Sequence, residues 1–92
     1  MKQEIAETVG LQALAWLAGN DEIFPVFLGS SGASATDLKD RAQDPAFLAA
    51  VLDFVCMDDA WVTGFCDSAG LGYDQPMRAR HALPGGGEMN WT

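Results

Sequence analysis

Asp44 and Pro45 form the clearest helix start in this sequence, and the helix that they begin is expected to supply much of the core. An aspartate at the N-cap accepts the free backbone N–H groups of the first turn, and proline is tolerated at the first helical position. The residues that follow repeat at helical spacing on one face: Phe47, Leu48, Val51, Leu52 and Val55. We therefore expect a core helix here, not a strand.

The N-terminal part of the chain predicts one long and one short helix. From Glu4 to Ala18 the residues are apolar or good helix formers, and Gly19 is expected to end this helix in the left-handed conformation. Because only a strip through Glu4, Thr8, Gln12 and Ala15 could face water, we expect this helix to be central. Asn20 or Asp21 should cap a short second helix that carries Pro25 in its first turn, followed by a loop at 29–32.

Three further helices complete the expected set. Ser34 to Asp37 resembles a capping box and opens a short third helix that ends near Ala42. Asp58 should cap the fifth helix, which ends near Gly70, and the sixth should begin around Asp74 to Pro76 and end before Pro84. No segment shows the period-two alternation of a strand, so the expected fold is an all-α bundle of about six mostly short helices.

The chain is long enough for one domain and too short for two, at 92 residues of which 49% are hydrophobic. We expect a single helical domain over 1–84 and a flexible, glycine-rich tail over 85–92. A shift of about 37 residues also aligns the two halves of the domain, pairing 21–24 with 58–61 and, after one inserted residue, Gly32 with Gly70. Because helices commonly begin with acids and end with bases, the sequence leaves open whether the two three-helix halves arose by duplication.

Charge and cysteine content narrow the partners and the compartment. Thirteen acidic against five basic residues give a net charge of −8, and every charged residue between Arg41 and Arg78 is acidic. This balance opposes binding to nucleic acid and to anionic membranes. No apolar segment is long enough to span a bilayer, and Glu4 and Glu7 interrupt the place where a signal peptide would be apolar. We expect a cytoplasmic protein with Cys56 and Cys66 as buried, reduced thiols.

Three segments, in this order along the chain, resemble those of a known family. They are 13–18 (Ala-Leu-Ala-Trp-Leu-Ala), 44–54 (Asp-Pro-Ala-Phe-Leu-Ala-Ala-Val-Leu-Asp-Phe) and 82–86 (Ala-Leu-Pro-Gly-Gly). They are similar to a family of small alphaproteobacterial proteins catalogued as a domain of unknown function, over almost everything from Glu4 to Gly86. The resemblance implies an all-helical fold. It does not point to any particular activity. Gly64 and the residues from Gly87 onward lie outside the family's pattern.

The titratable residues do not form a catalytic pattern. His81, the single histidine, stands beside the basic Arg78 and Arg80, which do not pair with it as the acidic residue of a catalytic triad would. Asp58 and Asp59 are adjacent, so on a helix they point about 100° apart, and an N-cap explains them. The loop at 29–32 lacks the lysine of a phosphate-binding loop. We therefore expect no enzyme activity, no metal and no cofactor.

Large apolar side chains are abundant for so short a chain, which favours a non-catalytic protein-interaction module that binds another protein or a second copy of itself. The alternative is a small-molecule binder with an apolar pocket gated by Trp16 or Trp61. Two further contacts are conceivable: Trp91 in the tail as an interface anchor, and the basic cluster of Arg78, Arg80 and His81 against an acidic surface. Idle tail residues and complementation of a helix C-terminus are the simpler explanations of these two features.

Overall fold

The computed structural model describes residues 1–83, and within that range the chain is helical throughout its regular elements. In chain order the elements are α1 (Gln3–Ala18), α2 (Phe24–Ser31), η1 (Ala35–Asp37), α3 (Leu38–Arg41), α4 (Pro45–Val55), α5 (Asp59–Ala69) and α6 (Gln75–Ala82). No strand occurs among the described residues, so the expected all-α bundle is confirmed. The tail at 85–92 lies outside the described residues.

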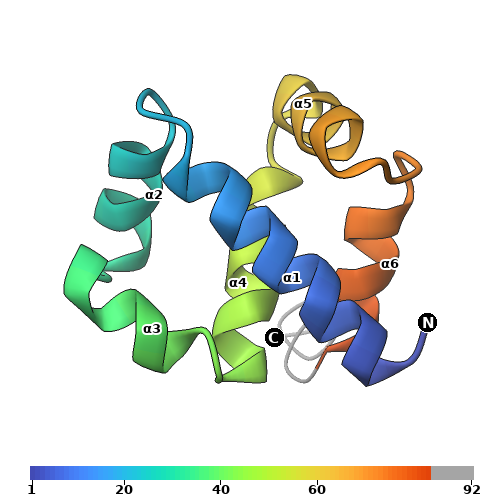
Figure 1. The fold of residues 1–92 in the computed structure, drawn as a ribbon, viewed down its shortest axis with the longest axis horizontal. Helices are drawn as coiled ribbons and strands as arrows, with labels where there is room; N and C mark the ends of the chain where they lie inside the picture. Colours follow the sequence, from blue (N-terminus) through green and yellow to red (C-terminus); the bar gives the residue numbers. More distant parts are fainter. Residues whose placement is uncertain (84–92) are drawn as a thin grey trace, which may run out of the picture.

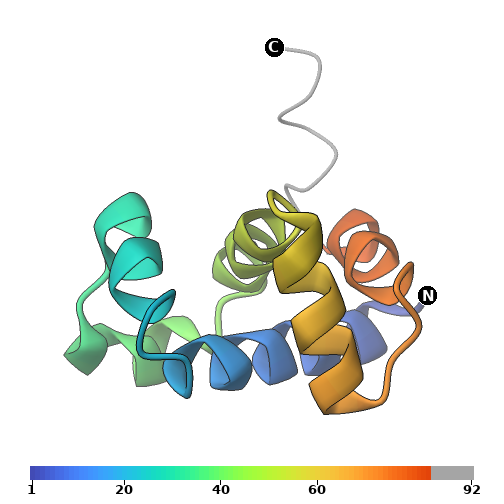
Figure 2. The ribbon, with the colours of Figure 1, turned by 90° about the horizontal axis from the view of Figure 1, so that it is seen from above.

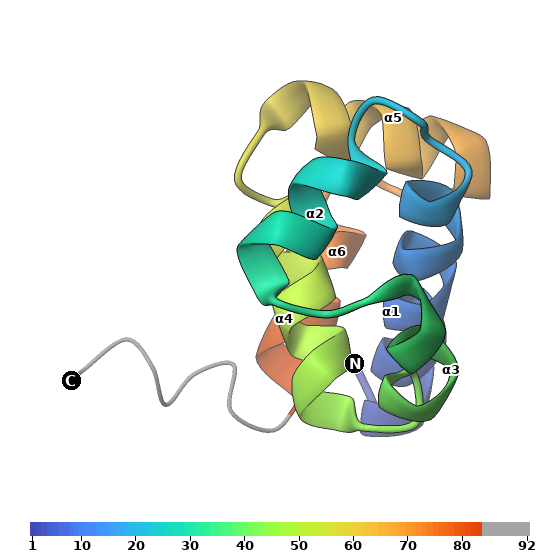
Figure 3. The same cartoon turned by 90° about the vertical axis from the view of Figure 1, so that its left-hand side faces the viewer.

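The helices form two layers (Figure 1). Seen from above, α1 and α3 lie in one layer and α2, α4 and α6 lie in the other (Figure 2). Helix α5 runs across one end of both layers, which Figure 3 shows at the top. Helix α1 packs against α2, α4, α5 and α6, so its central position is confirmed.

One core connects the first helix to the end of the sixth. Its largest fully buried side chains include Leu17, Phe27, Leu48, Leu52 and Phe65. Helix α4 contributes most, because all five apolar residues of its predicted stripe are buried. Helices α1 and α4 approach so closely that a Cβ added at Gly10 would lie 2.9 Å from the Leu48 Cβ.

Aromatic rings join three helices, α2, α4 and α5, through the core. The Phe27 ring of α2 meets the Phe47 and Phe54 rings of α4 at centroid distances of 6.0 and 5.2 Å. The Phe54 ring in turn stacks on Trp61 of α5 at 4.9 Å. These ring contacts hold α2 and α5 onto α4.

Two of the predicted caps form as expected. The Asp44 side chain accepts a hydrogen bond from the Ala46 N–H at 3.0 Å, and the Asp58 side chain accepts one from the Ala60 N–H at 2.8 Å. Helix α5 ends at Gly70, which has a φ of 71°. Asn20 caps the turn before α2 and not, as expected of Asn20 or Asp21, the helix itself: the Asn20 side-chain oxygen accepts from the N–H groups of Glu22 and Ile23, and Ile23 is the N-cap of α2.

Three further local predictions are wrong. Gly19 has a φ of −86° and is not left-handed, because α1 ends in a tightened turn in which the Gly19 N–H bonds the Ala15 carbonyl and the Asn20 N–H bonds the Leu17 carbonyl. Helix α2 continues through Ser31, where a loop was expected, and ends at the left-handed Gly32, with a φ of 72°. The capping box at Ser34 does not form, since its hydroxyl pairs with that of Thr36 at 2.9 Å.

The two half-chains agree in one feature and differ in another. Gly32 and Gly70, which the proposed repeat aligns, both end a helix in the left-handed conformation. The final helices differ, because α6 packs against α1 and α4 whereas α3 has only four residues and packs beside η1. The duplication therefore stays a prediction.

Candidate interaction surface

The outer side of α1 carries an apolar surface with a small residue at its centre. Ala15 is exposed and lines two hollows, one on each side of α1. Toward α3 the hollow has a volume of about 260 Å³ and is lined by Leu11, Leu14, Ala15, Ala18, Leu38, Lys39 and Ala42. Toward α5 the hollow has a volume of about 320 Å³ and is lined by Gln12, Ala15, Trp16, Phe65, Ser68 and Ala69. Because they share Ala15, the two hollows form one surface, which we call the α1 face; Figure 1 looks onto α1.

The α1 face is almost free of charge. Within residues 1–83, Lys39 is the one charged residue that lines either hollow. Charged residues make up 20% of the whole chain, and the chain is strongly acidic. The centre of a protein interface is typically depleted in charge in the same way.

The sequence analysis identified only part of this surface. Glu4, Thr8, Gln12 and Ala15 are exposed as expected, but the exposed strip of α1 is wider and more apolar than a strip through these positions. Ile5 is 53% exposed and Leu11 is 44% exposed. Leu11 and Ala18 recur at helical spacing with Ala15, so this signal is present in the sequence.

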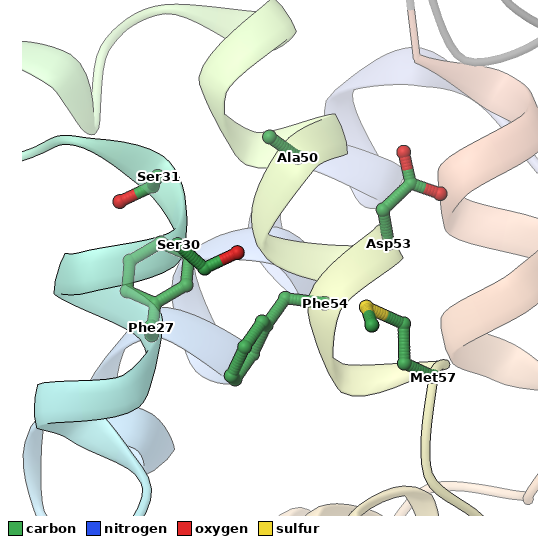
Figure 4. A pocket seen from close by; sticks show the side chains of 7 residues that line it. All are labelled: Phe27, Ser30, Ser31, Ala50, Asp53, Phe54 and Met57. Carbon is green, nitrogen blue, oxygen red and sulfur yellow. The ribbon is translucent and has the colours of Figure 1, made fainter.

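A third hollow lies between α2 and α4 (Figure 4). Phe27 and Phe54 are buried at its base, Ser30 and Met57 are exposed at its edge, and its volume is about 190 Å³. Pockets that bury a drug-sized ligand have volumes of about 300–1,000 Å³. This hollow is therefore smaller than such pockets.

Only one of the two tryptophans suggested as gates lines a hollow. Trp16 is half-buried beside the hollow between α1 and α5, where its ring lies 6.1 Å from that of Phe65. Trp61 stacks on Phe54 and packs against the core. The stacking of Trp61 is the packing expected of a structural aromatic residue.

The structure separates the three residues of the basic cluster. Arg80 points inward and its guanidinium forms an ion pair with Asp53 of α4, leaving only 14% of the Arg80 side chain exposed. In Figure 4 the Asp53 carboxylate lies on the side of α4 that faces α6. Arg78 is exposed and pairs with Asp74 at 3.5 Å, and His81 is exposed beside it at a hollow that Met1 also lines. Trp91, the fourth predicted contact residue, lies outside the described residues.

Replacing Arg80 with Ala should lower the free energy of unfolding by about 1–3 kcal/mol, because it leaves the half-exposed Asp53 without its partner and removes a packed stem. Arg78→Ala is the matched control on the same helix. Its ion pair is mostly exposed, so the change should be within about 0.5 kcal/mol. Urea denaturation of both variants measures the two values, and equal losses would show that Arg80 is not a structural residue.

The two cysteines are free thiols whose pKa values are raised. Cys66 is buried, and burial raises the pKa of both Cys56 and Cys66. Across residues 1–83, no three His, Cys, Asp or Glu side chains gather where they could hold a metal ion. In the same range every helix falls short of the length or hydropathy that a membrane crossing demands.

The sequence of this chain matches one known protein family. Residues 3–86 match the family described as "Protein of unknown function (DUF3572)". The chain belongs to this family. No curated protein and no solved structure matches the chain.

The match to the family covers all the helices that the structure describes within residues 1–83, and it confirms the resemblance to a domain of unknown function. Gly64 of α5, which lies outside the pattern of that resemblance, has a structural role in this chain. A Cβ added at Gly64 would lie 3.2 Å from Cζ2 of Trp16. The glycine thus lets the indole lie close to the α5 backbone, at one edge of the α1 face.

Tyr73 and Asp67 fasten the turn between α5 and α6. The Tyr73 hydroxyl donates a hydrogen bond to the Asp67 carboxylate at 2.8 Å, and this bond and the carboxylate's charge raise the pKa of Tyr73. The phenol must be protonated to donate. The bond therefore contributes to stability below the ordinary tyrosine pKa and is lost as the pH rises through the raised value.

Asp67→Ala should lower the pKa of Tyr73 toward the ordinary value of about 10. Tyr73 is the single tyrosine of the chain, so an ultraviolet difference titration reports on it alone. Ser68→Ala, at the neighbouring exposed position, is the control and should leave the titration unchanged. A titration that is the same in wild type and Asp67→Ala would refute the hydrogen bond.

Proposed function

We propose that this chain is a small, acidic, non-catalytic module that binds protein through the α1 face. The observation that carries the proposal is the continuity of that face. One exposed alanine joins two hollows, and the residues around it are apolar or uncharged apart from Lys39. A partner that fills both hollows would cover Leu11 and Trp16 at once.

Burial of apolar area supports this function energetically. Each Å² of apolar surface removed from water contributes about 25 cal/mol, and partly exposed Leu and Trp side chains supply that area on the α1 face. Large aromatic residues such as Trp16 commonly anchor interfaces. Small residues such as Ala15 and Ala18 let a partner backbone approach closely.

We propose a cytoplasmic protein that binds neither nucleic acid nor anionic membranes. A net charge of −8 disfavours nucleic acid and anionic membranes as partners, because both are polyanionic. Free thiols with raised pKa values are compatible with a reducing cytoplasm. We propose an alphaproteobacterial source on the resemblance alone.

A small-molecule ligand is the second candidate, and the position of Trp16 favours it. The hollow beside Trp16 has a volume of about 320 Å³, at the lower end of the range for ligand pockets. A ligand there should change the tryptophan fluorescence of the wild type and leave that of Trp16→Phe unchanged. Constant fluorescence across a panel of metabolites and lipids would remove this candidate.

Capture from a native lysate of the source organism tests the interaction function. Tagged wild type, Ala15→Glu and the control Ala46→Glu are compared after washes at low and at high salt. Both alanines are exposed helical residues, but Ala46 is outside all the hollows described above. Circular dichroism establishes that each variant is folded.

We expect a bound protein to survive high salt with wild type and Ala46→Glu, because an apolar contact is not screened. Ala15→Glu should lose it, since a buried, unpaired carboxylate is costly. Identical capture by all three variants would show that the α1 face does not bind protein.

A further inference from the structure

We infer that the occupant of the α1 face is a second copy of this chain, with the two α1 helices packed antiparallel about a two-fold axis at Ala15. This inference rests on the proposed function and names its partner. Two-fold dimers are the commonest assemblies of soluble proteins, and their interfaces pair one surface with itself. The α1 face must therefore be complementary to itself in charge and in shape.

Charge favours the α1 face as the place where two copies can meet. Each copy carries a net charge of −8, so most approaches are repulsive. The residues that line the α1 face include no carboxylate, so two copies that meet through this face bring none of their many acidic side chains together among these residues. The acidic Glu4 is about 16 Å from Ala15 along the helix axis, well away from the proposed two-fold.

Shape is complementary in the same arrangement. Leu11, which is 44% exposed, lies four residues before Ala15, and the exposed Gly19 lies four residues after it. In an antiparallel pair centred on Ala15, Leu11 of one copy therefore stands opposite Gly19 of the other. The exposed Leu11 side chain then packs against Gly19, which has no side chain. The two-fold axis repeats this contact, so it occurs twice in the dimer.

Cysteine cross-linking tests the position of the axis. Residues on a two-fold axis meet their own copies, so Ala15→Cys should form a disulfide-linked dimer of twice 9.8 kDa under mild oxidation. Ala46→Cys and the wild type are the controls and should stay monomeric on non-reducing gels, since Cys66 is buried and burial raises the pKa of both native thiols. Equal cross-linking of Ala15→Cys and Ala46→Cys would overturn the proposed axis.

Sedimentation equilibrium of the full chain tests the association without a cross-link. The dissociation constant of the dimer should fall as NaCl rises from about 50 to 500 mM, because salt screens the repulsion between like-charged copies. Ala15→Glu should raise it at least about tenfold. A wild type that stays monomeric at every salt concentration, or a dimer that weakens with salt or survives Ala15→Glu, would overturn the inference.

The outcomes also separate this inference from the proposed function. A monomeric wild type that captures a different protein, with capture lost in Ala15→Glu, refutes the second copy and leaves the interaction function standing. A wild type that neither dimerises nor captures any protein in an Ala15-dependent way refutes both. A dimer that meets the cross-linking and salt criteria supports both.

Discussion

Replacing Phe27 with Ala should lower the free energy of unfolding by about 3–5 kcal/mol. Phe27 is 1% exposed and its ring meets both Phe47 and Phe54. It is also the one residue of α2 that is fully buried. Truncation therefore leaves a cavity and removes the contact that fastens α2 to α4.

Urea denaturation followed by circular dichroism measures this loss. Val26→Ala is the matched control on the same helix, because Val26 is 54% exposed, and it should change stability by less than about 0.5 kcal/mol. Domains of this kind have a total stability of about 5–15 kcal/mol, so Phe27→Ala should be marginally folded at 37 °C. A loss below about 1 kcal/mol would mean that α2 is not fastened through Phe27.

Gly10→Ala should destabilise the fold by about 1–3 kcal/mol, although alanine is the better helix former. The added Cβ would lie 2.9 Å from the Cβ of Leu48. The Leu48 Cβ is tied directly to the α4 backbone and cannot rotate away, so α1 and α4 would have to separate. Separation costs packing between the two helices that contribute the most buried residues to the core.

Gly29→Ala is the control for helix propensity. Gly29 also lies within a helix, α2, and a Cβ added there would meet nothing within 4 Å. This variant should gain about 0.5–1 kcal/mol, because alanine loses less backbone freedom than glycine in a helix. We expect the changes in the free energy of unfolding of Gly10→Ala and Gly29→Ala, measured by the same denaturation, to have opposite signs. If both substitutions stabilise the fold, α1 and α4 can accommodate a Cβ at position 10 and the close contact is refuted.

Much of the fold follows from local signals in the sequence. Asp44 and Asp58 start their helices as predicted, because capping depends only on a few neighbouring residues. The end of α2 was missed because Gly29 and Ser30 are typical of loops, and the left-handed Gly32 decides where the helix stops. The capping box at Ser34 failed since a neighbouring hydroxyl competed for the Ser34 side chain.

The candidate site was less predictable, because it depends on contacts between distant segments. Nothing in the local sequence pairs Arg80 with Asp53, so Arg80 was grouped with Arg78 and His81 as a surface cluster. Likewise, the hollow between α1 and α3 needs Leu38 and Leu11 to come together through the tertiary fold. The apolar part of the exposed α1 strip was visible at helical spacing, but the two hollows beside it were not.

The α1 face as a protein-binding surface is tested most directly by NMR of the full chain with ¹³C-labelled alanine methyl groups. Spectra are recorded for the purified protein over a range of concentrations and then in native lysate. We predict that the methyl signals of Ala15, Ala18 and Ala42 shift or broaden on association, while those of the exposed Ala46 and Ala50 of α4 stay unchanged. Unchanged signals at Ala15, Ala18 and Ala42 under every condition, or changes confined to α4, would contradict the account.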